Sequence, residues 1–431
     1  MKLPIVFAVV ITSISAAAAP PAAKTAPAKV TAPLAAAKPE EAGMSSQRLE
    51  RIGPVLRAEI DKGTMPGAVV AVARKGKLVY YEAFGYADKA NSVAMPKDAI
   101  FTIASMTKPL TTTGALMLYE EGRLLLNDPV GKYLPQLDNM QVARLGPDGR
   151  ILGTEPARRK PTLQDLMRHT AGLTYGNRGD TELFQRYPQS SNDSADAMSG
   201  DEFLLKLGNL PLHYQPGSTW DYSLGLDVLG LTEEAVTKQR LGEYLAQRVL
   251  QPLGMTDTAF AIPAASAARY AKALPTSPET GRPQAFRDPT QAFKFDCGGG
   301  CAFSTAMDYL RFAEMLRGHG KLGDTQILAR KTVEFMTADQ LGPEVNVQKL
   351  RDYPNINGYG FGLSVAVRRT EGVPGIMGTP GDFHWGGANG TYFWVDPKEE
   401  LAVVFMTATP GDLRIHFRQM ITTLVLQAIA D

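Results

Sequence analysis

The sequence has few of the residues that build metal or thiol chemistry. Its 431 residues include only two cysteines and five histidines. No His-Glu-x-x-His motif occurs, and no histidines or cysteines cluster with acidic residues, so we expect no metal ion and no other cofactor. No Gly-x-Ser-x-Gly occurs either, which argues against a nucleophile elbow. The net charge of +1, without a lysine or arginine cluster, argues against nucleic acid and acidic membranes as partners.

The chain also lacks long apolar runs, apart from one at the amino terminus. Lys2 precedes an apolar stretch over 3–14, and small residues follow it. The stretch is short for a membrane span and ends before Pro20 and Pro21. We therefore predict a signal peptide over 1–19, with the mature protein periplasmic or secreted and free of the membrane. An uncleaved membrane anchor is the alternative.

Beyond this leader, the chain is long enough for two domains or one large one. The Ala/Pro/Lys-rich residues 20–42 are typical of a disordered linker. Strand-like segments lie at both ends of the remainder, with helical patterns between them, so we predict an α/β domain of 43–104 and 291–431 with a mainly helical domain, 105–290, inserted. The predicted elements are helices at 45–62, 109–126, 305–318 and 412–430, a hairpin at 67–84, and strands at 361–368, 391–396 and 401–407.

Ser105-Met106-Thr107-Lys108 places a serine and a lysine three residues apart, on one face of a helical turn. A serine hydroxyl is a weak nucleophile until a base takes its proton, and a neutral lysine in a dry pocket can be that base. Pro109 is tolerated only in a first helical turn. We therefore predict that Ser105 lies at a helix N-terminus, where free N–H groups favour developing negative charge. The alternative is a serine that only caps the helix.

Two further segments could complete a site around this serine. Tyr222 lies between a Pro-Gly turn and a helical run, and a tyrosine can shuttle protons if a nearby ammonium lowers its pKa. A core tyrosine is the alternative. Gly386 and Gly387 precede the strand at 391–396; bare glycines on an edge strand let a substrate approach the backbone, so that an N–H faces an oxyanion. An ordinary glycine-rich loop is the alternative.

Together, these three segments resemble the serine β-lactamase and penicillin-binding-protein superfamily, most closely its class C-like branch, which includes the family VIII carboxylesterases. The resemblance covers the chain from about residue 40 and implies a β-lactamase-like fold, in which helices flank an antiparallel sheet, and a serine hydrolase that forms an acyl-enzyme. Further segments that carry the resemblance are Met65–Val69, Leu166–Leu173, Pro216–Gly225, Gly298–Gly300 and Ser304–Tyr309.

The resemblance also implies a role for each matching residue. Ser105 is expected to be the acylated nucleophile and Lys108 its base or proton relay, with Tyr222 sharing the base role. The backbone N–H groups of Ser105 and Ala388 are expected to form the oxyanion hole, because Trp385-Gly386-Gly387 stands where the family has its Lys-Thr-Gly triplet.

Two departures from the family pattern concern the substrate. Leu224 replaces the asparagine of Tyr-x-Asn, and Trp385 replaces the lysine that attracts a substrate carboxylate in antibiotic-hydrolysing relatives. Tryptophan offers an apolar wall and one N–H donor instead. With Gly386 and Gly387, these are our candidate substrate-binding residues, and we expect a small neutral ester, although His384 or an arginine could still bind a carboxylate. The alternatives are a D,D-peptidase, D-aminopeptidase or β-lactamase of the same fold, and a non-catalytic binding or sensor protein.

Two remaining features are less specific. A Ser-His-Asp triad is disfavoured, because His169 belongs to a family segment that more often packs than reacts. Cys297 and Cys301 bracket three glycines, a flexible spacer that would allow a disulfide in an exported protein. Two reduced, buried thiols are the alternative, and this pair does not belong to the family pattern.

Overall fold

The structure, a computed structural model, describes residues 32, 34–284, 286–353 and 356–431. The predicted signal peptide and most of the predicted linker lie outside the described residues. Within the linker, however, Leu78 exchanges backbone hydrogen bonds with Ala35 and Ala37, and Pro39–Ala42 form a 3-10 helix. The folded chain therefore begins before residue 43, because this segment pairs with the second strand of the first hairpin.

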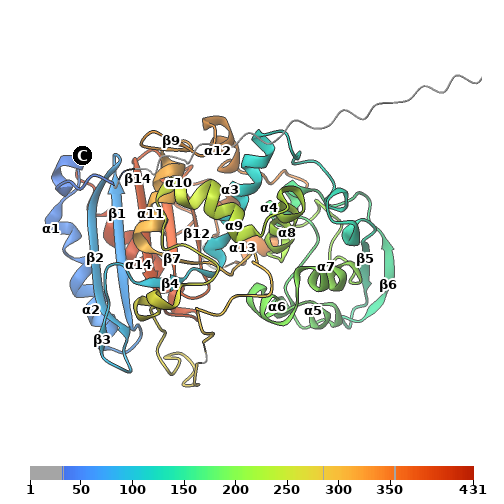
Figure 1. Cartoon of the computed structure of the whole chain (residues 1–431), viewed down its shortest axis with the longest axis horizontal. Helices are drawn as coiled ribbons and strands as arrows, with labels where there is room; N and C mark the ends of the chain where they lie inside the picture. Colours follow the sequence, from blue (N-terminus) through green and yellow to red (C-terminus); the bar gives the residue numbers. More distant parts are fainter. Residues whose placement is uncertain (1–31, 33, 285, 354–355) are drawn as a thin grey trace, which may run out of the picture.

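An eight-stranded antiparallel sheet stands at one end of the molecule (Figure 1). Its strands, in spatial order, are β10 (Tyr359–Phe361), β11 (Ala366–Arg368), β12 (Phe383–Gly386), β13 (Tyr392–Asp396), β14 (Leu401–Thr407), β1 (Gly67–Arg74), β2 (Lys77–Asp88) and β3 (Val93–Ala94). Segments from both ends of the chain thus pair with each other, through β1 and β14. Lys75 and Gly76 join β1 to β2, both at positive φ, as a tight hairpin turn requires.

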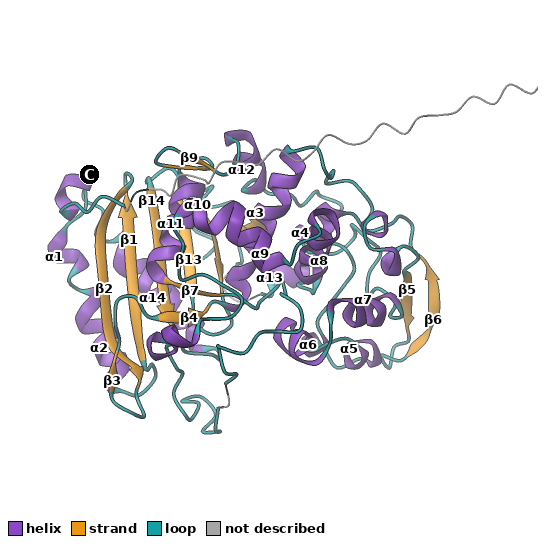
Figure 2. Ribbon diagram, in the orientation of Figure 1, coloured by secondary structure: helices purple, strands orange, loops and turns teal. Residues whose placement is uncertain are grey.

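Helices cover both faces of this sheet (Figure 2). On one face, α1 (Ser46–Leu49), α2 (Ile52–Asp61) and α14 (Leu413–Leu426) enclose an apolar cluster that includes Val70 and Val72. On the other face, α11 (Ala306–Arg317) packs against β1, β13 and β14, and Val69 and Ala71 join the main core. Successive β1 side chains thus enter two separate cores, as alternation along a strand dictates. The predicted fold, an antiparallel sheet flanked by helices, is confirmed.

The region between β4 (Ile100–Thr102) and β7 (Phe303–Thr305), which pair with each other, is mainly helical. Its elements are α3 (Thr107–Glu120), β5 (Gln141–Leu145), β6 (Ile151–Pro156), α4 (Leu163–Met167), α5 (Glu182–Arg186), α6 (Ser191–Ala197), α7 (Gly200–Gly208), α8 (Gly225–Thr237), α9 (Leu241–Leu245) and α10 (Gln251–Leu253). β8 (Lys321–Leu322), β9 (Thr325–Gln326), α12 (Arg330–Met336) and α13 (Gln348–Arg351) follow α11. The division into two domains stays a prediction. None of the helices in the described ranges has the length and apolar character to cross a bilayer.

Two local predictions need correction. Residues 361–368 belong to two strands, β10 and β11, joined by a turn in which Ser364 has a φ of 69°. Ser364 is held there because its N–H donates to the carbonyl of Met167 and its hydroxyl bonds to that of Thr112. These contacts are distant in sequence, so the apolar pattern could not reveal them. The helix predicted over 45–62 is likewise divided into α1 and α2.

Candidate active site

Ser105 and Lys108 lie at the beginning of α3. Ala104–Met106 form a 3-10 turn, and α3 begins at Thr107. Pro109 is the third residue of α3, where its missing N–H has no intrahelical partner, so the predicted position in the first turn is confirmed. Ala104 has a φ of 43°, a strained conformation for a residue with a Cβ, and this turns the chain sharply at Ser105.

Lys108 is 1% exposed, and its ammonium group reaches Ser105. Lys108 Nζ donates hydrogen bonds to Ser105 Oγ at 3.2 Å, to Tyr175 Oη at 3.3 Å and to the carbonyl oxygen of Gly299 at 2.5 Å. Burial lowers the pKa of Lys108 to about 8, and the nearby Asp227 carboxylate opposes this shift. A useful fraction of Lys108 is therefore neutral near physiological pH and can accept a proton from Ser105.

Tyr222 presents the face of its ring to this lysine. Lys108 Nζ lies 4.6 Å from the ring centroid, while the buried hydroxyl has no hydrogen-bond partner among the described residues. Burial raises the pKa of Tyr222, and the adjacent Ser105 hydroxyl offsets this only in part. The condition named above, that a nearby ammonium lowers this pKa, is not met, because desolvation is the largest influence on it. Tyr222 keeps its proton at neutral pH and is suited to donate it.

A closed chain of hydrogen bonds that the sequence analysis missed surrounds Lys108. Tyr175 Oη lies 3.0 Å from Ser191 Oγ, and Ser191 Oγ donates to Asp227 Oδ2 at 2.8 Å. Asp227 Oδ1 accepts the N–H of Gly299 at 2.9 Å, and the carbonyl of Gly299 returns to Lys108. Burial raises the pKa of Asp227 to about 6, against the attraction of Lys108. The one sign of this chain in the sequence is Asp227, an acidic residue between the apolar residues Leu226 and Val228 at the start of α8.

A cavity of about 440 Å³ opens beside Ser105. One part of its lining is aromatic, and another carries amides, hydroxyls and two arginines, Arg178 and Arg287. Arg178 Nε donates to Asp221 Oδ1 at 3.3 Å, and Arg287 Nε donates to Asp196 Oδ1 at 2.7 Å, so both cations already have acidic partners. The lining includes Thr102, Ser105, Tyr175, Ser191, Tyr222, Tyr270, Phe286, Phe293, Gly299, Phe303, Tyr353, Ala388 and Asn389. Ala388 thus lies in the same cavity as Ser105; its oxyanion-hole role stays a prediction.

A family model described as Beta-lactamase matches residues 52–421. The chain belongs to the β-lactamase family. Protein Rv1367c of Mycobacterium tuberculosis is 35% identical over 84% of this chain and 90% of that protein. Esterase EstB of Burkholderia gladioli is 31% identical over 86% of this chain and 94% of that protein.

Among solved structures, the chain is similar to EstCE1, a hydrolase with promiscuous acyltransferase activity. The TM-score is 0.73 at 26% identity, with 90% of this chain and 98% of that chain covered. The predicted superfamily is thereby confirmed, and the protein is a serine hydrolase of the β-lactamase family. Its assignment to the family VIII carboxylesterases stays a prediction.

Trp385, which replaces the family's lysine, lies behind the cavity rather than in its described lining. It is 3% exposed and packs among Tyr222, Tyr353 and Phe361, with ring centroids 5.3–5.7 Å apart. Its strand, β12, is not at the edge of the sheet as expected, since it lies between β11 and β13. β11 pairs only with Phe383 and His384 of β12, so Trp385 and Gly386 are unpaired on that side.

The other predicted substrate-binding residues also lie outside the described cavity lining. Leu224 is fully buried at the N-cap of α8. A Cβ on Gly387 would come within 2.3 Å of the Ile103 carbonyl oxygen, and one on Gly386 would meet the Arg418 guanidinium at 2.4 Å. The missing side chains at Gly386 and Gly387 therefore make room for other residues of the protein beside Ser105. The prediction that they make room for a substrate needs this correction.

The His169 ring makes no hydrogen bond to a carboxylate among the described residues. Its Nδ1 lies 3.2 Å from Ser223 Oγ, its ring packs 4.6 Å from that of Tyr222, and burial lowers its pKa well below the ordinary value. This is a packing role, as the sequence analysis favoured. Across the described residues, no group of three or more His, Cys, Asp or Glu side chains is arranged to hold a metal ion.

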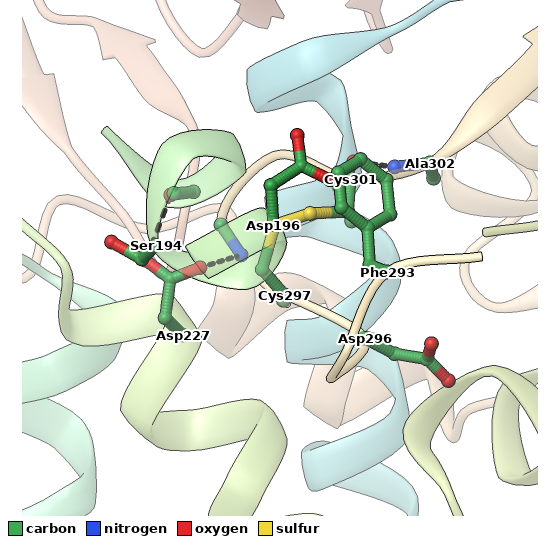
Figure 3. The surroundings of a disulfide bond; sticks show 12 residues. Ser194, Asp196, Asp227, Phe293, Asp296, Cys297, Cys301 and Ala302 are labelled. Carbon is green, nitrogen blue, oxygen red and sulfur yellow. Dashed lines mark hydrogen bonds between the residues drawn. A yellow bond between two sulfur atoms is a disulfide. The ribbon is translucent and has the colours of Figure 1, made fainter. Parts of the chain in front are cut away.

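The structure joins Cys297 and Cys301 in a disulfide, the pairing that the sequence analysis favoured. Both cysteines are buried. Figure 3 shows that Asp227 lies beside the disulfide loop, where it accepts the N–H of Gly299. The cross-link therefore closes the short loop that supplies a carbonyl to Lys108.

Proposed function

We propose that the protein hydrolyses small carboxylic esters through an acyl-enzyme on Ser105. The observation that carries the proposal is the hydrogen bond between Ser105 Oγ and Lys108 Nζ, a buried base with a pKa of about 8, at the wall of a cavity of about 440 Å³. The family membership of the chain supports the same chemistry.

In this mechanism, neutral Lys108 takes the proton of Ser105 as Ser105 Oγ attacks the ester carbonyl carbon. The N–H groups of Ser105 and Ala388 stabilise the oxyanion. When the tetrahedral intermediate collapses, the carbon–oxygen bond to the alcohol breaks and the alcohol leaves with the proton of Tyr222, which then receives the proton that Lys108 took from Ser105, so that Lys108 is neutral again. Water then attacks the acyl-enzyme and Lys108 takes its proton. When the second tetrahedral intermediate collapses, the bond from the acyl carbon to Ser105 Oγ breaks, Lys108 returns the proton to Oγ, and the carboxylic acid is released.

The two candidate bases differ in their protonation. With a pKa of about 8, roughly a tenth of Lys108 is neutral at pH 7, whereas Tyr222, whose pKa is raised by burial, is almost entirely protonated. We therefore assign proton abstraction to Lys108. Tyr222 has a free hydroxyl beside Ser105 and acts as the acid toward the leaving alcohol.

The charges in the cavity favour a neutral substrate. Arg178 and Arg287 are each paired with an aspartate, and the family's carboxylate-binding lysine is replaced by buried Trp385. A substrate carboxylate would have to compete with these pairs, while an ester needs no counter-charge. The aromatic side of the lining suits an acyl chain. The names of EstB and EstCE1, an esterase and a hydrolase, agree with this choice.

The test compares p-nitrophenyl acetate and butyrate with nitrocefin and a D-Ala-D-Ala peptide in burst kinetics, with intact mass spectrometry of the acylated protein. We expect ester turnover and an acyl adduct on Ser105, both lost in Ser105→Ala. Ser266→Ala, the same change outside the cavity lining, is the matched control and should keep turnover. Faster turnover of nitrocefin or of the peptide than of either ester would favour the alternative hydrolases. Unchanged ester turnover in Ser105→Ala would refute the acyl-enzyme.

We also propose that the protein is exported to the periplasm or the medium. The positively charged, apolar and small-residue segments at residues 1–19 support this, as does the disulfide. The mass of the mature amino terminus, measured on protein from the periplasmic fraction and the medium, tests it. An intact Met1 on cell-retained protein would contradict export.

A further inference from the structure

The disulfide loop 297–301 contacts the candidate base directly. Gly299, its central residue, accepts a hydrogen bond from Lys108 Nζ at 2.5 Å, the shortest of the three that Lys108 donates to described residues. Gly298 accepts one from Thr111 Oγ1, one turn further along α3, at 2.9 Å. Two consecutive carbonyl groups of the loop therefore accept hydrogen bonds from side chains of α3, one from Lys108 and one from Thr111.

The same loop is pressed against α8 from the other side. A Cβ on Gly298 would meet the Leu226 carbonyl oxygen at 2.4 Å, and one on Gly299 would meet the Asp227 carboxylate at 2.6 Å. The loop thus fits between α3 and α8 only because it is built of glycine. Asp227 Oδ1 accepts the Gly299 N–H, so this carboxylate and Lys108 Nζ contact opposite ends of one residue.

Three consecutive glycines have more accessible backbone conformations than any other tripeptide, and holding them in one conformation is entropically costly. The cross-link between Cys297 and Cys301 removes most of those conformations, and the Asp227 hydrogen bond orients what is left. The disulfide and the Asp227 hydrogen bond both constrain Gly299, whose carbonyl accepts the hydrogen bond from Lys108. Cys297, Cys301 and Asp227 do not belong to the lining of the cavity beside Ser105.

We propose that the Cys297–Cys301 disulfide and Asp227 form a positioning element that, through Gly299, holds Lys108 Nζ against Ser105 Oγ. The inference rests on the proposed acyl-enzyme chemistry and adds residues to it that act through Lys108. A misplacement of about 1 Å in such a group can cost roughly a hundredfold in rate, so the element contributes to kcat more than to substrate binding.

The titratable groups around Lys108 come from several elements. Asp227 lies on α8, and Tyr175, Tyr222, Tyr353 and His169 come from the loops packed around α3. Asp227 is the one acidic group among these, and its charge favours the ammonium form of Lys108. Burial, which the closed loop maintains, favours the neutral form and is the larger effect.

The two parts of the element therefore predict shifts of opposite sign. In Cys297→Ala/Cys301→Ala the loop opens and water reaches Lys108, so the acid limb of kcat/KM moves to higher pH and kcat for p-nitrophenyl butyrate falls about 10- to 100-fold, with KM little changed. In Asp227→Asn the side chain still accepts the Gly299 N–H but loses its charge, so the acid limb moves to lower pH.

Asp296→Asn is the matched control. Asp296 precedes Cys297 and is buried, but its carboxylate binds Arg240 and the N–H of Gly242, away from Gly299. This variant should lose thermal stability and keep the wild-type pH profile, which separates positioning from loss of stability. Circular dichroism confirms folding before kinetics.

The outcomes are distinct. The proposal is overturned if the folded cysteine variant keeps the wild-type kcat and the wild-type acid limb of kcat/KM. It is also overturned if the acid limb of Asp227→Asn does not move. If the cysteine variant does not fold, Asp227→Ala decides, because it removes the acceptor of the Gly299 N–H; an unchanged kcat in that variant overturns the proposal. A wild-type protein with no ester turnover and no Ser105 adduct would instead contradict the proposed function, because the positioning test needs an active wild type.

Discussion

Lys108 Nζ lies over the face of the Tyr222 ring, 4.6 Å from its centroid, and makes no hydrogen bond to the Tyr222 hydroxyl. The two groups meet through a cation–π contact, which favours the charged lysine modestly and leaves the tyrosine hydroxyl free. The arrangement divides the proposed acid and base roles between them. It also makes each role separately testable, because the hydroxyl can be removed without removing the ring.

The pH dependence of ester hydrolysis should report Lys108. Since the neutral amine is the active form and its pKa is about 8, kcat/KM should rise as pH increases and level off above about 8. Lys108→Met should lower kcat by about 10²- to 10⁴-fold and remove this limb. The measurement is a pH profile with p-nitrophenyl butyrate at constant ionic strength. The same limb in Lys108→Met would assign it to another group.

Tyr222→Phe should separate catalysis from stability. The Tyr222 hydroxyl is buried without a partner among the described residues, so its removal should leave the melting temperature unchanged or raise it. With an alkyl ester such as ethyl butyrate, whose alcohol needs a proton to leave, the rate should still fall by about 10²- to 10⁴-fold if the hydroxyl is the acid. Tyr244→Phe provides the opposite control, since it loses a 2.9 Å hydrogen bond to the Gly114 carbonyl far from the cavity. That variant should melt earlier and retain its rate, and a Tyr222→Phe enzyme with full activity would exclude the acid role.

Gly387→Ala should damage the site through the backbone. Its Cβ would lie 2.3 Å from the Ile103 carbonyl oxygen, two residues before Ser105, and something must shift. We expect a loss of about 1–3 kcal/mol in the free energy of unfolding together with reduced kcat. Gly372→Ala is the control, because nothing lies within 4 Å of its Cβ. Urea unfolding and ester kinetics on both variants test this, and equal behaviour of the two would contradict it.

Glu233 offers a test of stability against pH. Both carboxyl oxygens are buried without a hydrogen-bond partner among the described residues, and burial raises the pKa well above its ordinary 4.5. Above pH 4.5 the folded state therefore holds a proton that the unfolded state has released, so stability falls as pH rises.

Glu233→Gln removes that dependence. Its melting temperature should exceed the wild-type value, by more at pH 8 than at pH 5, with ester turnover unchanged. Asp165→Asn, which removes the charge of a buried carboxylate that pairs with Arg159 and Arg168 and whose pKa is lowered, should instead reduce stability. Melting curves at both pH values provide the test, and a Glu233→Gln gain that does not grow with pH would refute the assignment.

The sequence predicted well where the signal is local. The position of Ser105 and Lys108 in a first helical turn follows from Pro109, and the two arms of the β1–β2 hairpin follow from apolar runs around Lys75-Gly76. The family followed from the order of several short segments. Predictions failed where distant contacts decide: the Ser364 turn between β10 and β11 depends on Met167 and Thr112, which lie far away in the sequence.

By itself, then, the sequence determined the proposed nucleophile, its lysine, the family and the disulfide spacing, because these are properties of neighbouring residues. Only the tertiary structure decided what surrounds them. It placed Trp385 behind the cavity, gave Gly387 a contact with the protein's own chain, and connected Asp227 to Lys108 through Gly299. The physical reason is desolvation and close packing: the pKa of Lys108 is lowered by burial, and its neighbours Tyr175, Tyr222 and Gly299 come from segments far away in the sequence.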